Sequence, residues 1–164
     1  MQAFLDRRTV LCLMLLLPLV LLLFISTTDA YSLDMPGLKG HVARYNSNID
    51  KAPELLKTVL GSELVNLVVT RDNGSVFRAG MDVKNGRIVH LIPEGYNNST
   101  MIVTTNQRTI NQVVGAKDKI TAFTNQIDQG NIDIQTNNWI SDIKIQSLLS
   151  SSSVLQFGFN LFFG

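Results

Sequence analysis

The pattern of apolar and polar positions divides the chain into two parts. Residues 9–25 are almost all Leu, Val, Met, Phe and Ile, so this stretch is apolar on every face of a helix. Further along, short apolar runs alternate with polar turns, as in a small folded domain. We therefore predict an N-terminal apolar segment over residues 1–30, a spacer over 31–48 and one folded domain over 49–164.

The N-terminal segment has features of both a secretory signal and a membrane anchor. Arg7 and Arg8 precede the apolar run, and polar residues 26–30 follow it. The run is long for a signal core and slightly short for a membrane span of about 20 residues, so cleavage and anchoring both stay open. The basic flank keeps the N-terminus in the cytoplasm. We expect the domain outside the membrane, anchored to it through residues 9–25, or secreted if the signal is cleaved.

Charge and cysteine content exclude several classes of protein. The formal net charge is +1 over 164 residues, which argues against a nucleic-acid partner. The single cysteine, Cys12, lies in the apolar run, so the domain has no disulfide, thiolate zinc site or cysteine nucleophile. Glycosylation sequons at Asn73, Asn97 and Asn98 are compatible with export.

The first half of the domain combines one helical pattern with three strand patterns. Residues 49–60 carry apolar side chains at helical spacing, with Pro53 in the first turn and Gly61 as a stop. Alternating apolar and polar residues then predict strands over 64–71, 76–83 and 87–92. Because Asn-Gly pairs separate these runs, we predict an antiparallel meander of three strands.

The second half changes period several times. A fourth strand is predicted over 100–105, followed by two short helices that end at Gly115 and Gly130. A fifth strand covers 131–136, and a third helix begins at Asn138.

The last residues alternate with a period of two, because every second residue from Leu155 to Phe163 is Leu or Phe. This pattern predicts a strand, with a helix packed over a cleft as the alternative. The complete order of elements predicts an α+β fold, with a five-stranded, mainly antiparallel sheet and helices packed on one face.

The stretch "MIVTTNQRTINQVVGAKDKITAFTNQIDQGNIDI", continuing into "NNWISDIKIQSLL", resembles the sterol-carrier-protein type 2 family. That family shows a strand, a short helix ending in Gly, a second helix ending in Gly, and a strand reading Gly-x-hydrophobic-x-hydrophobic. The preceding "VFRAGMDVKNGRIVHLI" is similar to the family's central strand pair. The resemblance covers residues 49–150 and rests on element order and glycine placement.

The chain also departs from this family. Family domains lack an apolar run such as residues 9–25, and this chain ends in Phe162-Phe163-Gly164 instead of a peroxisomal targeting tripeptide. These departures put a peroxisomal or sterol-specific role in doubt more than they do the fold.

The resemblance implies a lipid-sized apolar cavity between the sheet and the helices. The apolar stripes are consistent with it, since Met and aromatic side chains form adaptable walls, but such stripes also form solid cores. The expected ligand-binding residues come from the inward faces of both layers: Phe77, Ala79, Met81, Met101, Val103, Ile110, Val114, Ile120, Phe123, Ile127, Trp139 and Ile143.

The sequence shows no catalytic or metal-binding pattern. His41 and His90 are the only histidines, and neither has a neighbouring set of acidic ligands. Residues 128–133 superficially resemble a calcium loop but lack its glutamate at position twelve, so we interpret them as a helix-to-strand turn. We therefore expect no enzyme, no metal and no cofactor.

Two functions follow from this reading. The first is a membrane-tethered or exported module that binds or transfers a lipid or another apolar ligand. The alternative is a non-enzymatic extracytoplasmic structural or protein-interaction domain with a solid core, which would present a sheet edge or its Phe-rich tail to a protein partner.

Overall fold

The computed structural model describes residues 34–59 and 61–163. The predicted signal or anchor helix over residues 1–30 lies outside them, and none of the described helices is long and apolar enough to cross a membrane. The helices are α2 (Met35–Asn48), the 3-10 helix η1 (Ile49–Lys51), α3 (Glu54–Val59), α4 (Gln107–Gly115), α5 (Lys119–Asp128), α6 (Trp139–Leu149) and α7 (Ser152–Phe163). The strands are β1 (Ser62–Thr70), β2 (Val76–Lys84), β3 (Arg87–Pro93), β4 (Met101–Asn106) and β5 (Asp133–Thr136).

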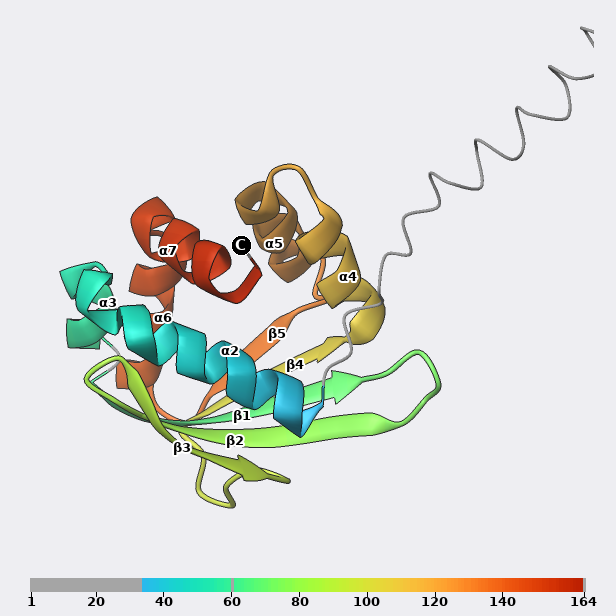
Figure 1. The fold of residues 1–164 in the computed structure, drawn as a ribbon, viewed down its shortest axis with the longest axis horizontal. Helices are drawn as coiled ribbons and strands as arrows, with labels where there is room; N and C mark the ends of the chain where they lie inside the picture. Colours follow the sequence, from blue (N-terminus) through green and yellow to red (C-terminus); the bar gives the residue numbers. More distant parts are fainter. Residues whose placement is uncertain (1–33, 60, 164) are drawn as a thin grey trace, which may run out of the picture. The chain divides into compact units, whose positions relative to one another are not determined.

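The strands form one five-stranded mixed sheet in the order β3-β2-β1-β4-β5. The pairs β1–β2, β2–β3 and β4–β5 are antiparallel, whereas β1 and β4 run parallel. The helices lie over one face of this sheet (Figure 1). The predicted α+β class, the meander and the mainly antiparallel sheet are therefore confirmed, with one parallel pairing that the sequence pattern did not predict.

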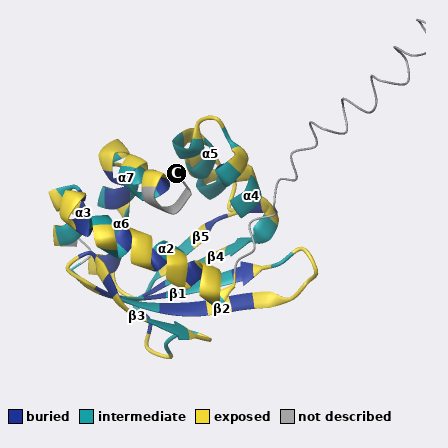
Figure 2. Ribbon diagram, in the orientation of Figure 1, coloured by how far each residue is buried: buried dark blue, intermediate teal, exposed yellow. Residues whose placement is uncertain are grey.

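Local turn and strand chemistry explains the meander. Asn85 and Gly86 both have positive φ, 51° and 75°, which suits the two-residue turn between β2 and β3. Alternate residues of β1 and β2, such as Val69, Phe77 and Ala79, are buried in one hydrophobic cluster with residues of α2. Figure 2 shows buried stretches along the central strands.

The connection from β3 to β4 crosses the opposite face of the sheet. Its Tyr96 is tied to Asn66 of β1, because the Asn66 amide donates to the Tyr96 carbonyl at 2.9 Å and accepts from the Tyr96 N–H at 2.8 Å. The Tyr96 ring and Gly95 lie so close to Gly80 of β2 that a Cβ there would stand 2.7 Å from the ring and 2.9 Å from the Gly95 Cα. Gly80 therefore lets the crossing loop lie flat on the sheet.

The prediction of a spacer over 31–48 is wrong for residues 35–48, which form α2. The Asp34 carboxylate caps this helix by accepting a hydrogen bond from the Gly37 N–H at 2.7 Å. Leu38, Val42 and Tyr45 are buried at the spacing i, i+4, i+7. This periodic signal is present in the sequence but short, and it is interrupted by polar residues and glycine.

Side-chain hydrogen bonds attach α2 to the β2–β3 hairpin. The Asn46 amide donates to the Ile88 carbonyl at 2.7 Å and accepts from the Ile88 N–H at 3.0 Å, as a neighbouring strand would. The Tyr45 hydroxyl donates to the Gly86 carbonyl at 2.6 Å. These bonds fix the position of α2 relative to the edge of the sheet.

Two other helical predictions need correction. The single helix expected over 49–60 is split into η1 and α3, because Ala52 is extended at ψ 146° and the residue before a proline disfavours the helical region. The C-terminal residues form helix α7, so the strand prediction is wrong and its helical alternative is confirmed.

The elements between β4 and α7 agree with the sequence pattern. Asn106 and Asn138 cap α4 and α6, each accepting a hydrogen bond from a backbone N–H three residues later at 2.8 Å. These caps act within one helical turn, so the sequence alone is enough to predict them.

The contact at Gly80 is testable in residues 31–164, which form one compact unit. Gly80→Ala should lower the free energy of unfolding by about 1–3 kcal/mol, since the new methyl group would overlap the crossing loop. Equilibrium unfolding in urea measures this change. Gly115→Ala is the matched control, because a Cβ there meets nothing within 4 Å and alanine favours the helix. Equal stability of Gly80→Ala and wild type would contradict the described crossing.

Candidate functional site

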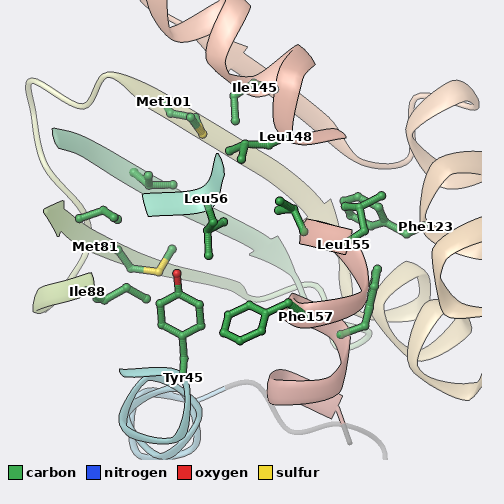
Figure 3. Close-up of a pocket in the computed structure, with 15 residues that line it drawn as sticks. Tyr45, Leu56, Met81, Ile88, Met101, Phe123, Ile145, Leu148, Leu155 and Phe157 are labelled. Atoms are coloured by element: carbon green, nitrogen blue, oxygen red, sulfur yellow. The ribbon is translucent and has the colours of Figure 1, made fainter. Parts of the chain in front are cut away.

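An apolar cavity of about 340 Å³ lies between the sheet and the helical layer (Figure 3). It is partly open to solvent. Its strand side comes from neighbouring positions at one end of the sheet, since Val65 pairs with both Met81 and Met101. The lining residues are Tyr45, Leu56, Val65, Met81, Val83, Ile88, Met101, Phe123, Ile145, Leu148, Val154, Leu155, Phe157, Gly158 and Phe159.

Helix α7 forms a roof over this space. It contacts α2, α5 and α6. The Phe157 ring meets Tyr45 of α2 edge-on with centroids 6.3 Å apart, and Phe159 meets Phe123 of α5 edge-on at 5.4 Å. Figure 3 shows the Tyr45 and Phe157 rings next to each other on one side of the cavity. Since α7 is supported by the neighbouring helices, space remains above the strands.

The cavity wall offers almost no polar group to a ligand. Tyr45 is the only polar side chain among the described lining residues, and its hydroxyl already donates to the Gly86 carbonyl. Burial raises the pKa of Tyr45 to about 12, against the opposing effect of the Arg87 charge. The phenol is therefore neutral at physiological pH, and the described wall carries no ionised side chain.

Three of the predicted ligand-binding residues line the cavity. Met81 and Met101 project from the sheet, and Phe123 reaches it from α5 (Figure 3). The two thioethers are flexible and polarisable, so this part of the wall can adapt to ligands of different shape.

Four other predicted residues belong to the solid part of the core. Phe77 and Ala79 are buried, and Val103 and Ile110 pack against the same cluster. Phe77, Ala79 and Val103 lie further along the sheet than Val65 and its partners, beyond the end over which the cavity opens. Ile110 lies on α4 and does not line the cavity. The alternation of apolar residues predicts which face of the sheet lies toward the cavity. It does not predict at which end of the strands the cavity lies.

The predicted residues on the helices are more dispersed. Ile120 lines a second, mainly polar cavity between α5 and α7. Val114 and Ile127 are half-buried and do not line the apolar cavity.

The inward orientation predicted for Trp139 and Ile143 is wrong. Their side chains are 72% and 54% exposed. Helix α6 has apolar residues spread around its axis among polar ones, without a single apolar stripe, so its sequence does not reveal which face is inward. In the structure Ile145 and Leu148 face the cavity instead.

Sequence reasoning missed the contributions of α2 and α7 to the wall. The predicted spacer includes Tyr45, although its spacing from Leu38 and Val42 is helical. The α7 residues form the Phe-rich tail, whose period-two pattern conceals the i, i+4 pair Leu155 and Phe159. Only the packing of distant segments brings these residues to the cavity.

A buried ionic cluster ties α6 to the start of β1. The Glu63 side chain is 2% exposed and lies 2.7 Å from the Lys144 ammonium. Its other carboxylate oxygen accepts from the Thr100 hydroxyl at 2.6 Å and the Ser141 hydroxyl at 3.1 Å. Burial raises the pKa of Glu63, but these hydrogen bonds and the Lys144 charge outweigh burial and lower the pKa below its ordinary value.

This cluster contains the groups of a catalytic pair, but a substrate cannot reach them. Ser141 and Lys144 have the Ser-x-x-Lys spacing of some nucleophile–base pairs. Ser141 is buried, and both side chains are bonded to Glu63. The arrangement is therefore a structural tie between α6 and the sheet.

The other polar candidates also lie away from the cavity. His90 is exposed on β3, with Nδ1 3.4 Å from the Asp82 carboxylate. Residues 128–133 form the predicted turn from α5 into β5, in which the Gln126 carbonyl accepts from the N–H groups of Asn131 and Ile132.

Comparison with solved structures shows a sterol-carrier-protein-2-like fold. A crystal structure of sterol carrier protein 2 superposes with a TM-score of 0.52 and 10% identity, covering 77% of this chain and 95% of that one. A conserved hypothetical protein from Thermus thermophilus superposes with a TM-score of 0.51 and 10% identity, covering 82% and 92%. No protein-family model and no curated protein matches the chain. The fold that the sequence resemblance predicted is confirmed.

The Glu63 cluster predicts a specific pH dependence of stability. A carboxyl group with a lowered folded-state pKa stabilises the fold above its ordinary value of 4.5, and this contribution is lost as the pH falls through the folded-state pKa. Glu63→Gln should lower the free energy of unfolding at pH 7 by about 1.5–3 kcal/mol and flatten its decrease below pH 4.5.

Urea unfolding at pH 7 and at several acidic values measures both effects. Glu54→Gln is the control, because Glu54 forms an exposed ion pair with Lys57 that contributes at most about 1 kcal/mol. The same acid dependence in wild type and Glu63→Gln would show that Glu63 does not contribute in this way.

Proposed function

We propose that this chain is a passive carrier that binds the apolar part of a lipid in the cavity beneath α7. The observation that carries the proposal is the cavity itself, which has an apolar wall built from both layers of the domain. Contact between the apolar wall and water is unfavourable. An apolar ligand that covers the wall gains about 25 cal/mol of binding free energy for each Å² of apolar surface removed from water. Binding of this kind needs no covalent step. The fold likeness to sterol carrier protein 2 supports the same function.

The chemistry of the wall indicates which part of a lipid enters. The described lining has no charged side chain, and the Tyr45 hydroxyl is engaged by the Gly86 carbonyl. A polar headgroup would lose its hydration there without replacement, so it stays at the opening. The volume of about 340 Å³ lies near the lower end of ligand pockets, roughly 300–1,000 Å³, and favours a single acyl chain over a bulkier polycyclic ligand.

The proposal includes attachment or export through the N-terminal segment. The basic residues Arg7 and Arg8 before the apolar run support a domain on the extracytoplasmic side. An uncleaved anchor would hold the cavity close to the donor bilayer and raise the effective concentration of lipid. If the segment is cleaved, the same domain would act as an exported carrier.

The alternative function, a structural domain with a solid core, has less support. It requires the helical and sheet layers to interlock, whereas a cavity lies between them.

A substitution in the cavity floor tests ligand binding. Met81→Arg should reduce the affinity of residues 31–164 for a pyrene-labelled fatty acid at least about tenfold, because a guanidinium group placed in the apolar cavity is desolvated. Fluorescence titration measures the affinity, and circular dichroism checks that the variant is folded.

Val89→Arg is the matched control, since Val89 lies on the neighbouring strand β3 and is 40% exposed. It should bind the probe as wild type does. Unchanged binding by a folded Met81→Arg variant would place the ligand elsewhere, and no binding by wild type would reject the carrier function.

The α7 roof predicts a kinetic effect. Phe157→Ala removes the ring contact with Tyr45, so the roof should open more readily and the probe should dissociate about three- to tenfold faster. Stopped-flow transfer of the probe to acceptor vesicles measures the rate. Gln156→Ala, at an exposed position of the same helix, should leave it unchanged. Equal dissociation rates in wild type and Phe157→Ala would show that the ligand leaves by another route.

A further inference from the structure

Helix α6 exposes three large apolar side chains on its outer face. Trp139, Ile140 and Ile143 are 72%, 51% and 54% exposed. At about 100° of rotation per residue, they fall within a sector of roughly 100° at the N-terminal half of the helix. We call these three residues the α6 apolar face.

The opposite side of α6 faces the interior of the domain. Ile145 and Leu148 line the cavity, and Ser141 is buried against Glu63. The apolar side of a helix normally faces the core, whereas Trp139, Ile140 and Ile143 meet solvent. Its outer face therefore lacks an apolar partner within the described part of the chain.

We propose that the α6 apolar face docks on the surface of a lipid bilayer. Tryptophan is favoured at the boundary between headgroups and acyl chains, where its ring is buried and its N–H stays hydrated. Three side chains cover much less than the roughly 800 Å² per partner of a stable protein interface. The adjacent Asn137 and Asn138 are polar and uncharged, and the exposed Asp142 disfavours anionic lipid, so the expected surface is zwitterionic.

The length of chain before α2 supports a bilayer as the partner. Nine residues, 26–34, separate the apolar run 9–25 from Met35, and they span at most roughly 30 Å. When that run stays in a membrane as an uncleaved anchor, which is one of the two cases of the proposed function, the domain cannot move far from the bilayer. Even a small apolar patch is then held at a high effective concentration of lipid surface.

Docking through α6 would also serve the proposed carrier function, on which this step rests. One side of α6 is a wall of the cavity, and the other would lie in the interface. A lipid would then have a short path between the acyl region of the bilayer and the cavity.

Trp139 is the only tryptophan of the chain, so its fluorescence reports on this face directly. The full chain is reconstituted in phosphatidylcholine vesicles, with or without lipid brominated on the upper acyl chain. Bromine should reduce the fluorescence at least about twofold, because an interfacial tryptophan lies at that depth. Ile140→Ser combined with Ile143→Ser should remove most of the quenching. Absence of quenching in the wild type would overturn the proposal.

A second reporter separates docking from simple tethering. Trp139→Phe combined with Val76→Trp moves the tryptophan to a position that is 46% exposed in wild type. Val76 pairs with Thr70, whereas α6 follows Thr136, which pairs with Met101 at the other end of the sheet. This variant should show little quenching. Equal quenching of both reporters would mean that tethering alone brings them to the membrane, and would overturn docking through α6.

Two further measurements identify the partner of the α6 apolar face and separate docking from ligand uptake. Quenching at Trp139 should not depend on the number of protein copies per vesicle. Quenching that weakens as this number rises would mean that the α6 apolar face binds a second copy of the chain instead of the bilayer. Met81→Arg should lose fatty-acid uptake but keep the quenching. Uptake without quenching in the wild type would overturn docking alone, whereas quenching without uptake would overturn only the carrier function.

Discussion

The separation between α7 and the sheet is the constraint on which the candidate site depends. Protein interiors are normally packed as densely as crystals of small organic molecules. A cavity therefore persists only where its walls are held apart. Here Phe157 packs on Tyr45 and Phe159 packs on Phe123, which supports α7 on α2 and α5. Helix α6 supports α7 as well. The roof therefore stays above the floor formed by Met81 and Met101.

The supports are themselves held by polar interactions outside the cavity. Asn46 pairs with the backbone of Ile88 and fixes α2 to the sheet, and Glu63 binds Lys144 of α6. Directional bonds thus set the positions of the helices, while the wall needs only apolar side chains. Such a wall selects ligands by size and polarity, because it offers few hydrogen bonds with which to recognise a particular headgroup.

Helix α6 combines two roles that its sequence does not separate. Leu148 faces the cavity, whereas Trp139 faces solvent, and both positions are apolar. The phase of this helix is set by the Asn138 cap at its start and by the attachment of Lys144 to Glu63, which lies far away in the sequence. For this reason the prediction that Trp139 and Ile143 face inward is wrong, although the predicted helix is present.

The sequence alone determined the elements that depend on neighbouring residues. The Asn85-Gly86 turn, the asparagine caps and the alternating strands are decided within a few positions, and with them the α+β class. Tertiary structure decided the parallel pairing of β1 with β4, the burial of α2 and the extent of the cavity. These features depend on how segments distant along the chain pack together. Residues such as Tyr45 and Phe157 therefore become neighbours only in the folded protein.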